Sequence, residues 1–141
     1  MKIKITAIIF FMLLLISVLS CAPSTKQVLA TNQSQVKLRA IQTRAFETID
    51  REMMLRTVIA TLQDLSFIID KADDELGTVS GTKLDKYALR MTVAIRPRGE
   101  SQLLVRANAQ YEIYAVEDPE PYQQFFEALS KALFLTAHQV D

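Results

Sequence analysis

The 141-residue sequence has little of what most catalytic centres are built from. It contains one cysteine, one histidine, three glycines and no tryptophan. A single cysteine excludes a disulfide within one molecule. With only one histidine beside it, the chain cannot assemble a zinc site from the usual nitrogen and sulfur ligands. Gly77, Gly81 and Gly99 stand too far apart to form a phosphate-binding glycine loop.

Other catalytic patterns are missing as well. A serine triad would need His138, which lies near the C-terminal end, and no serine sits in a Gly-x-Ser-x-Gly elbow. The acidic residues between Asp70 and Glu75 lack the spacing of an EF-hand loop, so an ordinary acidic turn is favoured over a calcium site. We therefore expect no enzyme, no metal and no cofactor.

The charges are balanced, with 16 Lys and Arg against 16 Asp and Glu. Without Lys2 and Lys4, the 14 remaining basic residues face 16 acidic ones, a net charge of −2. Domains that bind nucleic acid usually carry a basic excess. We therefore expect no nucleic-acid partner.

The most informative segment is the first 21 residues. Lys2 and Lys4 precede an apolar run from Ile5 to Leu19, which is typical of an export signal and short for a membrane-spanning helix. The following residues, Val18-Leu19-Ser20-Cys21, resemble the lipobox of bacterial lipoproteins. That resemblance implies cleavage before Cys21 and its lipidation, usually by three acyl chains, which is enough for firm anchoring. The alternative is a chance thiol near an ordinary cleaved signal or a short membrane anchor.

The residue after the cysteine bears on localisation. Ala22 is not the aspartate of the inner-membrane retention signal of enteric bacteria. We therefore expect a lipid-anchored protein of the cell envelope, at the outer membrane, with its domain facing the periplasm. Residues 1–20 are the predicted signal peptide. Residues 21–40 are the lipidated cysteine and a flexible polar tether, and residues 41–141 form one domain.

Periodicity predicts the elements of this domain. A strand is expected at 41–48. A helix follows the N-cap Asp50, with Ile49 packed on Met54 as a hydrophobic staple. Further strands are expected at 66–70, 78–84, 87–96 and 102–114, and a second helix after Pro121. The order β-α-β-β-β-β-α predicts an α+β fold, with two amphipathic helices on one face of an antiparallel sheet.

The hairpin between the last two long strands allows a prediction of register. A three-residue loop, Arg98-Gly99-Glu100, sets Ile95 against Leu103 and therefore keeps apolar residues opposite one another. The same alternation defines two faces of the sheet.

Each face supplies a candidate site. The apolar face carries small residues that leave room for a helix or for a shallow ligand cavity, and packing is the favoured reading; with the facing helix, the set is Met91, Ala107, Ala109, Phe126 and Leu129. The polar face carries Arg90, Arg96 and Arg106, a possible docking surface for an acidic partner or lipid headgroups. A solvated face is the favoured reading there.

Two segments resemble a known family. Leu62-Gln63-Asp64-Leu65-Ser66-Phe67-Ile68-Ile69-Asp70 and Leu76-Gly77-Thr78-Val79 resemble the helix-to-strand passage of small bacterial envelope lipoproteins of BamC-like, helix-grip type. Ser66 stands where that pattern usually has glycine. The resemblance implies a helix-grip fold and an accessory role, and it brings no catalytic residues.

Three classes of function remain. We expect first a non-catalytic accessory lipoprotein that docks on an envelope protein complex, anchored to the membrane by lipid on Cys21. The alternative is a binder or carrier of an apolar ligand or lipid held between the helices and the sheet. An enzyme is the least favoured class.

Overall fold

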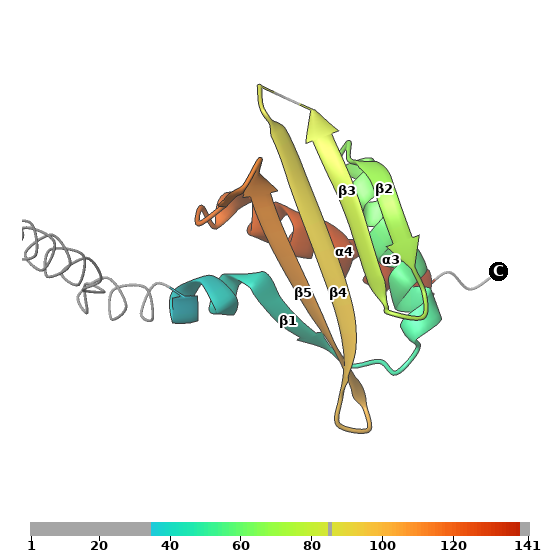
Figure 1. Ribbon diagram of the computed structural model, residues 1–141. Helices are drawn as coiled ribbons and strands as arrows, with labels where there is room; N and C mark the ends of the chain where they lie inside the picture. The colour runs from blue at the N-terminus through green and yellow to red at the C-terminus, as the bar shows by residue number, and fades with distance from the viewer. Residues whose placement is uncertain (1–34, 85, 139–141) are drawn as a thin grey trace, which may run out of the picture. The chain divides into compact units, whose positions relative to one another are not determined.

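The computed structural model describes residues 35–84 and 86–138, with side chains through residue 135 (Figure 1). It confirms the predicted α+β class. Residues 35–42 are helical. The elements that follow are β1 (Thr43–Phe46), α3 (Arg51–Asp64), β2 (Ile68–Asp73), β3 (Thr78–Leu84), β4 (Ala88–Arg98), β5 (Gln102–Tyr111), β6 (Tyr114–Ala115) and α4 (Glu120–His138).

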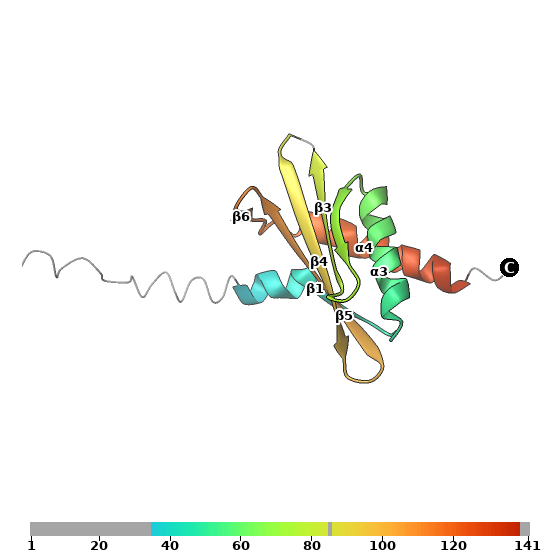
Figure 2. The ribbon, with the colours of Figure 1, turned by 45° about the vertical axis from the view of Figure 1, so that its right-hand side comes forward.

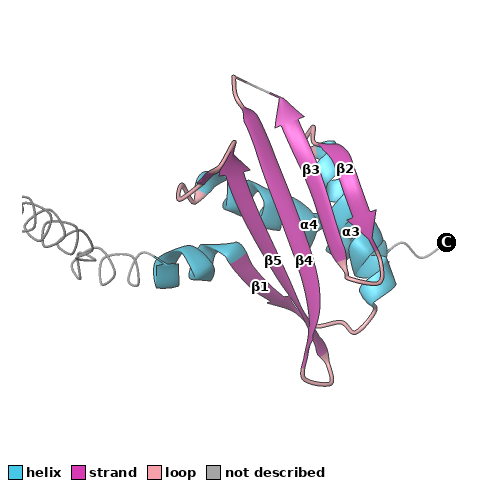
Figure 3. Cartoon of the chain, viewed as in Figure 1, coloured by secondary structure: helices cyan, strands magenta, loops and turns pink. Residues whose placement is uncertain are grey.

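The strands form one antiparallel sheet in the order β1-β5-β4-β3-β2, and β6 also pairs with β5 (Figure 3). Helices α3 and α4 lie together on one face of this sheet, while neither covers the other face (Figures 1 and 2). Alternation explains the two layers, because every second side chain in the middle of β4 and β5 is buried against the helices. The expected arrangement of two helices on one face is thus present.

Helix α3 begins where the sequence predicts. The Asp50 side chain accepts a hydrogen bond of 2.8 Å from the Met53 N–H and so satisfies one free donor of the first turn. The predicted staple is wrong, because Ile49 is 70% exposed while Met54 is fully buried. Ile49 therefore lies mainly in solvent, and the Asp50 cap is the predicted feature that is present at the start of the helix.

The β4–β5 hairpin corrects the predicted register. Ile95 pairs with Val105, not with Leu103, and Arg98 pairs with Gln102, so the loop is Gly99-Glu100-Ser101. The length of the loop is as predicted, but the pairing is shifted by two residues. A shift of two leaves every side chain on its expected face, and alternation alone therefore cannot detect it.

The folded unit also starts earlier than predicted. It begins at Gln35, and residues 35–40, assigned above to the flexible tether, are helical. Leu38 and Ile41 pack against the core, and Gln42 is buried with its side-chain amide donating to the Tyr122 hydroxyl at 3.3 Å. Within the stretch assigned to the tether, Leu38 is the side chain that packs against the core, and the other residues from 35 to 40 are exposed.

The core lies between the sheet and the two helices. Tyr122 is its largest fully buried side chain, and it comes from the first turns of α4. Its hydroxyl donates to the Val116 carbonyl at 2.7 Å and accepts the Ala109 N–H at 3.2 Å. These bonds join α4 to the end of β5, where the candidate site lies.

Candidate functional site

The predicted lipidation site, Cys21, lies outside the described residues, as does the whole predicted signal peptide. Among residues 35–84 and 86–138, no helix is long and apolar enough to cross a membrane. The predicted site residues that the structure does describe form two groups, three arginines on the open face of the sheet and an apolar set in the core.

The three arginines lie on the face of the sheet that α3 and α4 leave open. The Arg90 Nε is 3.8 Å from an Asp70 carboxylate oxygen, and Arg96 donates to the Leu76 carbonyl at 2.6 Å. Arg106 is half-buried, and its Nε finds no hydrogen-bond partner in the described chain. Because two of the three guanidinium groups are held by the protein itself, this geometry gives no support to a free anion-binding cluster.

The acidic turn after β2 is organised by internal bonds. Asp73 accepts the Leu76 N–H at 2.9 Å, and this bond, followed by the charge of Lys71, lowers the pKa of Asp73. Arg51 donates to the carbonyls of Asp74 and Glu75, both at 2.6 Å. No group of three or more His, Cys, Asp and Glu side chains in the described part of the chain could hold a metal ion.

The apolar candidate set fills the core. These five residues are at most 3% exposed, and they are Met91, Ala107, Ala109, Phe126 and Leu129. The small side chains of β5 let α4 lie close to the sheet, which agrees with the packing reading. None of the five lines the cavity described below.

A group of exposed apolar side chains lies at one end of the sheet. We call it the end patch; it consists of Leu84, Tyr87, Tyr111, Ile113 and Tyr114, which are 40–84% exposed. The β3–β4 connection and the β5–β6 turn bring them to the same end of the sheet. The rings of Tyr87 and Tyr111 pack edge to face, with their centroids 6.3 Å apart. Tyr111 is also the cross-strand partner of Tyr114 in the pairing of β5 with β6.

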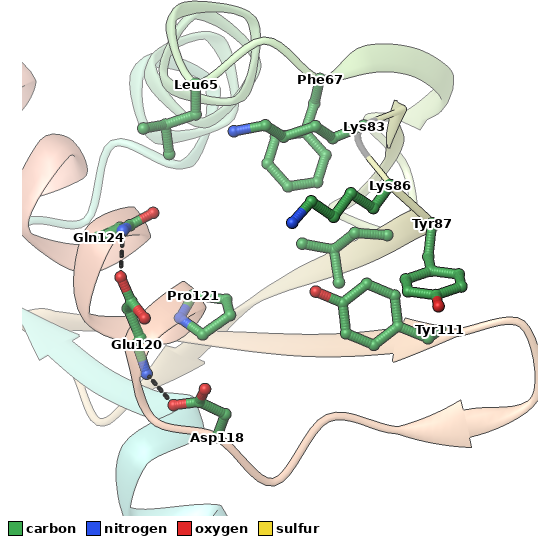
Figure 4. A pocket seen from close by; sticks show the side chains of 11 residues that line it. Leu65, Phe67, Lys83, Lys86, Tyr87, Tyr111, Asp118, Glu120, Pro121 and Gln124 are labelled. Carbon is green, nitrogen blue, oxygen red and sulfur yellow. Dashed lines mark hydrogen bonds between the residues drawn. The ribbon is translucent and has the colours of Figure 1, made fainter.

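A cavity of about 410 Å³ lies beside this patch (Figure 4). We call it the end cavity. Its walls come from the end of α3, the ends of β3, β4 and β5, and the start of α4. The lining residues are Leu65, Phe67, Lys83, Lys86, Tyr87, Leu89, Tyr111, Asp118, Glu120, Pro121 and Gln124. Its volume falls within the range of small-molecule sites.

Some polar side chains of the end cavity make hydrogen bonds within the chain, and others do not. Asp118 accepts the Glu120 N–H at 3.0 Å, and the Glu120 carboxylate accepts from the Gln124 side chain at 3.1 Å (Figure 4). Lys83 and Lys86 extend from the opposite side, and neither makes a hydrogen bond or ion pair with another described residue. The two lysines are therefore the charged groups without a described partner, and across the cavity they face two carboxylates that keep their negative charge.

Sequence reasoning missed both the end patch and the end cavity. Lys83, Lys86 and Tyr87 lie in or next to the connection after β3, where periodicity carries no signal. An available signal was Tyr111-Glu112-Ile113-Tyr114, a run that keeps apolar residues through a turn. Such a run is unusual for a turn that has only solvent around it.

Compared with protein-family models and with curated proteins, the chain matches none of them. The function therefore has to be argued from the geometry.

Proposed function

We propose that this chain is a membrane-anchored envelope lipoprotein whose domain docks on a partner protein through the end patch. The observation that carries the proposal is the gathering of five exposed large apolar side chains at one end of the sheet. Exposed apolar side chains that cluster, unlike scattered ones, commonly mark an interaction surface.

The composition of the end patch favours a protein as the partner. Three of its five residues are tyrosines, which interfaces enrich because a rigid ring buries much area and keeps a polar tip. Lys83 and Lys86 lie beside it, so the complementary surface would be apolar with an acidic rim. Docking of this kind needs no catalytic group, which is consistent with the chain's composition.

The docking proposal is tested by crosslinking in the cell. A photo-crosslinking amino acid in place of Ile113, which is 84% exposed, should capture one envelope protein. The same amino acid in place of Ile49, 70% exposed at the start of α3, is the matched control and should not capture it. Equal products from both positions, or none from position 113, would contradict the docking surface.

The anchor is tested separately. Cys21→Ser should move the protein from the membrane fraction to the soluble fraction, since the lipid is then absent. The intact mass of the wild-type protein should correspond to a chain that begins at Cys21 and carries acyl groups. A wild-type cysteine without added mass, or a Cys21→Ser protein that stays with the membrane, would overturn the lipid anchor.

A further inference from the structure

The end cavity has two charged walls and a half-apolar lining. Lys83 and Lys86 point their ammonium groups into it from one side, and the carboxylates of Asp118 and Glu120, each of which accepts one hydrogen bond from within the chain, lie on the other side. An anionic group between the lysines would receive charge-assisted hydrogen bonds, which are stronger than neutral ones. At the lysine wall, away from the two carboxylates, the head group of a ligand is therefore expected to be anionic.

The floor of the cavity is suited to hydrocarbon. Phe67 is 6% exposed and belongs to the core, and Leu65 and Leu89 pack against the same core. The turn that ends α3 fixes Phe67, because its N–H donates to the Leu62 carbonyl at 2.9 Å. Pro121 at the start of α4 closes the floor opposite it. A methylene chain on this floor would leave water without loss of a hydrogen bond.

An extended peptide is a poorer occupant. The strands that border the cavity, β3, β4 and β5, lie inside the sheet, and only the last two residues of β3, Lys83 and Leu84, lack a partner in β2, so little free edge remains to which a peptide could add as a strand. A single chain with one charged end needs no such edge.

We propose that the end cavity binds a single-chain amphiphile with an anionic head group. The head lies between Lys83 and Lys86, and the chain lies on Phe67 and Leu89. This proposal goes beyond docking. Tyr87 and Tyr111 belong to both the end patch and the cavity lining, but Ile113 and Tyr114, at which docking is tested, do not line the cavity, so the two proposals are tested separately.

The test uses the full chain in membranes from expressing cells. The probe is palmitic acid with a diazirine in its chain and a terminal alkyne, and the uncharged alcohol of the same chain is the comparison. We expect the acid to label peptides that contain Phe67, Leu89 or Pro121. Lys83→Gln with Lys86→Gln should reduce this labelling about tenfold. Lys37→Gln with Lys131→Gln removes the same charge from exposed helical positions and should leave labelling unchanged.

Competition experiments with unlabelled lipids identify the head group and test the proposal. Displacement of the probe by unlabelled palmitate would indicate a carboxylate head group, and displacement by lysophosphatidate would indicate a phosphate head group. Either result supports the proposal. Displacement by neither overturns it. Equal labelling by the acid and the alcohol overturns it too, as does undiminished labelling of the Lys83 and Lys86 double variant. Circular dichroism verifies that the double variant is folded.

Discussion

Gly77 occupies a position that only glycine fits. Its φ is +63°, and a Cβ there would come within 2.8 Å of the Arg51 guanidinium and 2.9 Å of the Ile95 carbonyl oxygen. Arg51 is fixed by the carbonyls it binds in the turn after β2. Gly77→Ala should therefore lower the free energy of unfolding by about 3 kcal/mol, from a left-handed backbone and an overpacked contact together.

Gly99 provides the matched control. It has the same φ of +63°, but a Cβ would meet nothing within 4 Å. Gly99→Ala should cost only about 1 kcal/mol, the strain of the left-handed backbone alone. Urea unfolding of both variants measures the difference. Equal losses would show that the contact with Arg51 and Ile95 is not restrictive.

The Tyr122 hydroxyl gives a second prediction for a single residue. It is buried, donates to Val116 and accepts from Ala109 and Gln42. Tyr122→Phe should lower the free energy of unfolding by about 1–3 kcal/mol, because the partners stay buried without a bond. Tyr111→Phe, at an exposed ring, should change it by less than about 0.5 kcal/mol. A thermal or urea unfolding series that finds equal effects would contradict this account of the α4–β5 junction.

The structural role of a single residue can be predicted best from the sequence where its partner lies a few residues away. Asp50 is an N-cap because its oxygen reaches an N–H only three residues away. The burial of Tyr122 was missed, because the two groups that donate to its hydroxyl, the Ala109 N–H and the Gln42 amide, lie 13 and 80 residues away. Long-range bonds of this kind leave no periodic trace in the sequence.

At the scale of the elements, the end of α3 is the most informative. The Ser66 N–H donates to Gln63 and the Phe67 N–H to Leu62, both at 2.9 Å, and Ser66 has a φ of +68°. This is the Schellman arrangement, in which glycine is usual at the left-handed position. Ser66 carries a Cβ at this position, where the left-handed backbone is strained for any residue but glycine.

Replacement of Ser66 is therefore predicted to stabilise the protein. Ser66→Gly should raise the free energy of unfolding by about 0.5–1 kcal/mol, since relief of strain exceeds the added freedom of the unfolded chain. Ser66→Ala, which keeps a Cβ, should bring no gain. Urea unfolding measures both, and a Ser66→Gly protein no more stable than Ser66→Ala would contradict the strained cap.

In the strands, periodicity predicts the buried face but not the pairing register. The strand at 78–84 was predicted with its observed bounds, and the apolar faces of β4 and β5 were assigned correctly. The pairing of Ile95 was wrong by two residues, because alternation has a period of two. The choice among registers that share the same faces is made by the turn, where Gly99 takes its positive φ as the first loop residue.

At the scale of the whole molecule, the candidate site depends on tertiary structure. The end cavity draws on residues from Leu65 to Gln124, supplied by β3, β4, β5, α4 and the connecting segments, and no single segment of the sequence contains it. The fold class could be predicted because each element carries its own pattern. The site could not, because it exists only where the ends of these elements meet.

The central claim is that the end patch docks the anchored domain on a partner protein. The most direct measurement is quantitative affinity purification after crosslinking in cells, with wild type and Ile113→Ser/Tyr114→Ser compared at matched abundance. Both side chains are more than two-thirds exposed, so we expect the variant to fold. The account predicts one envelope protein recovered with wild type and reduced at least about fivefold with the variant. Equal recovery of the same partners with both proteins would contradict it.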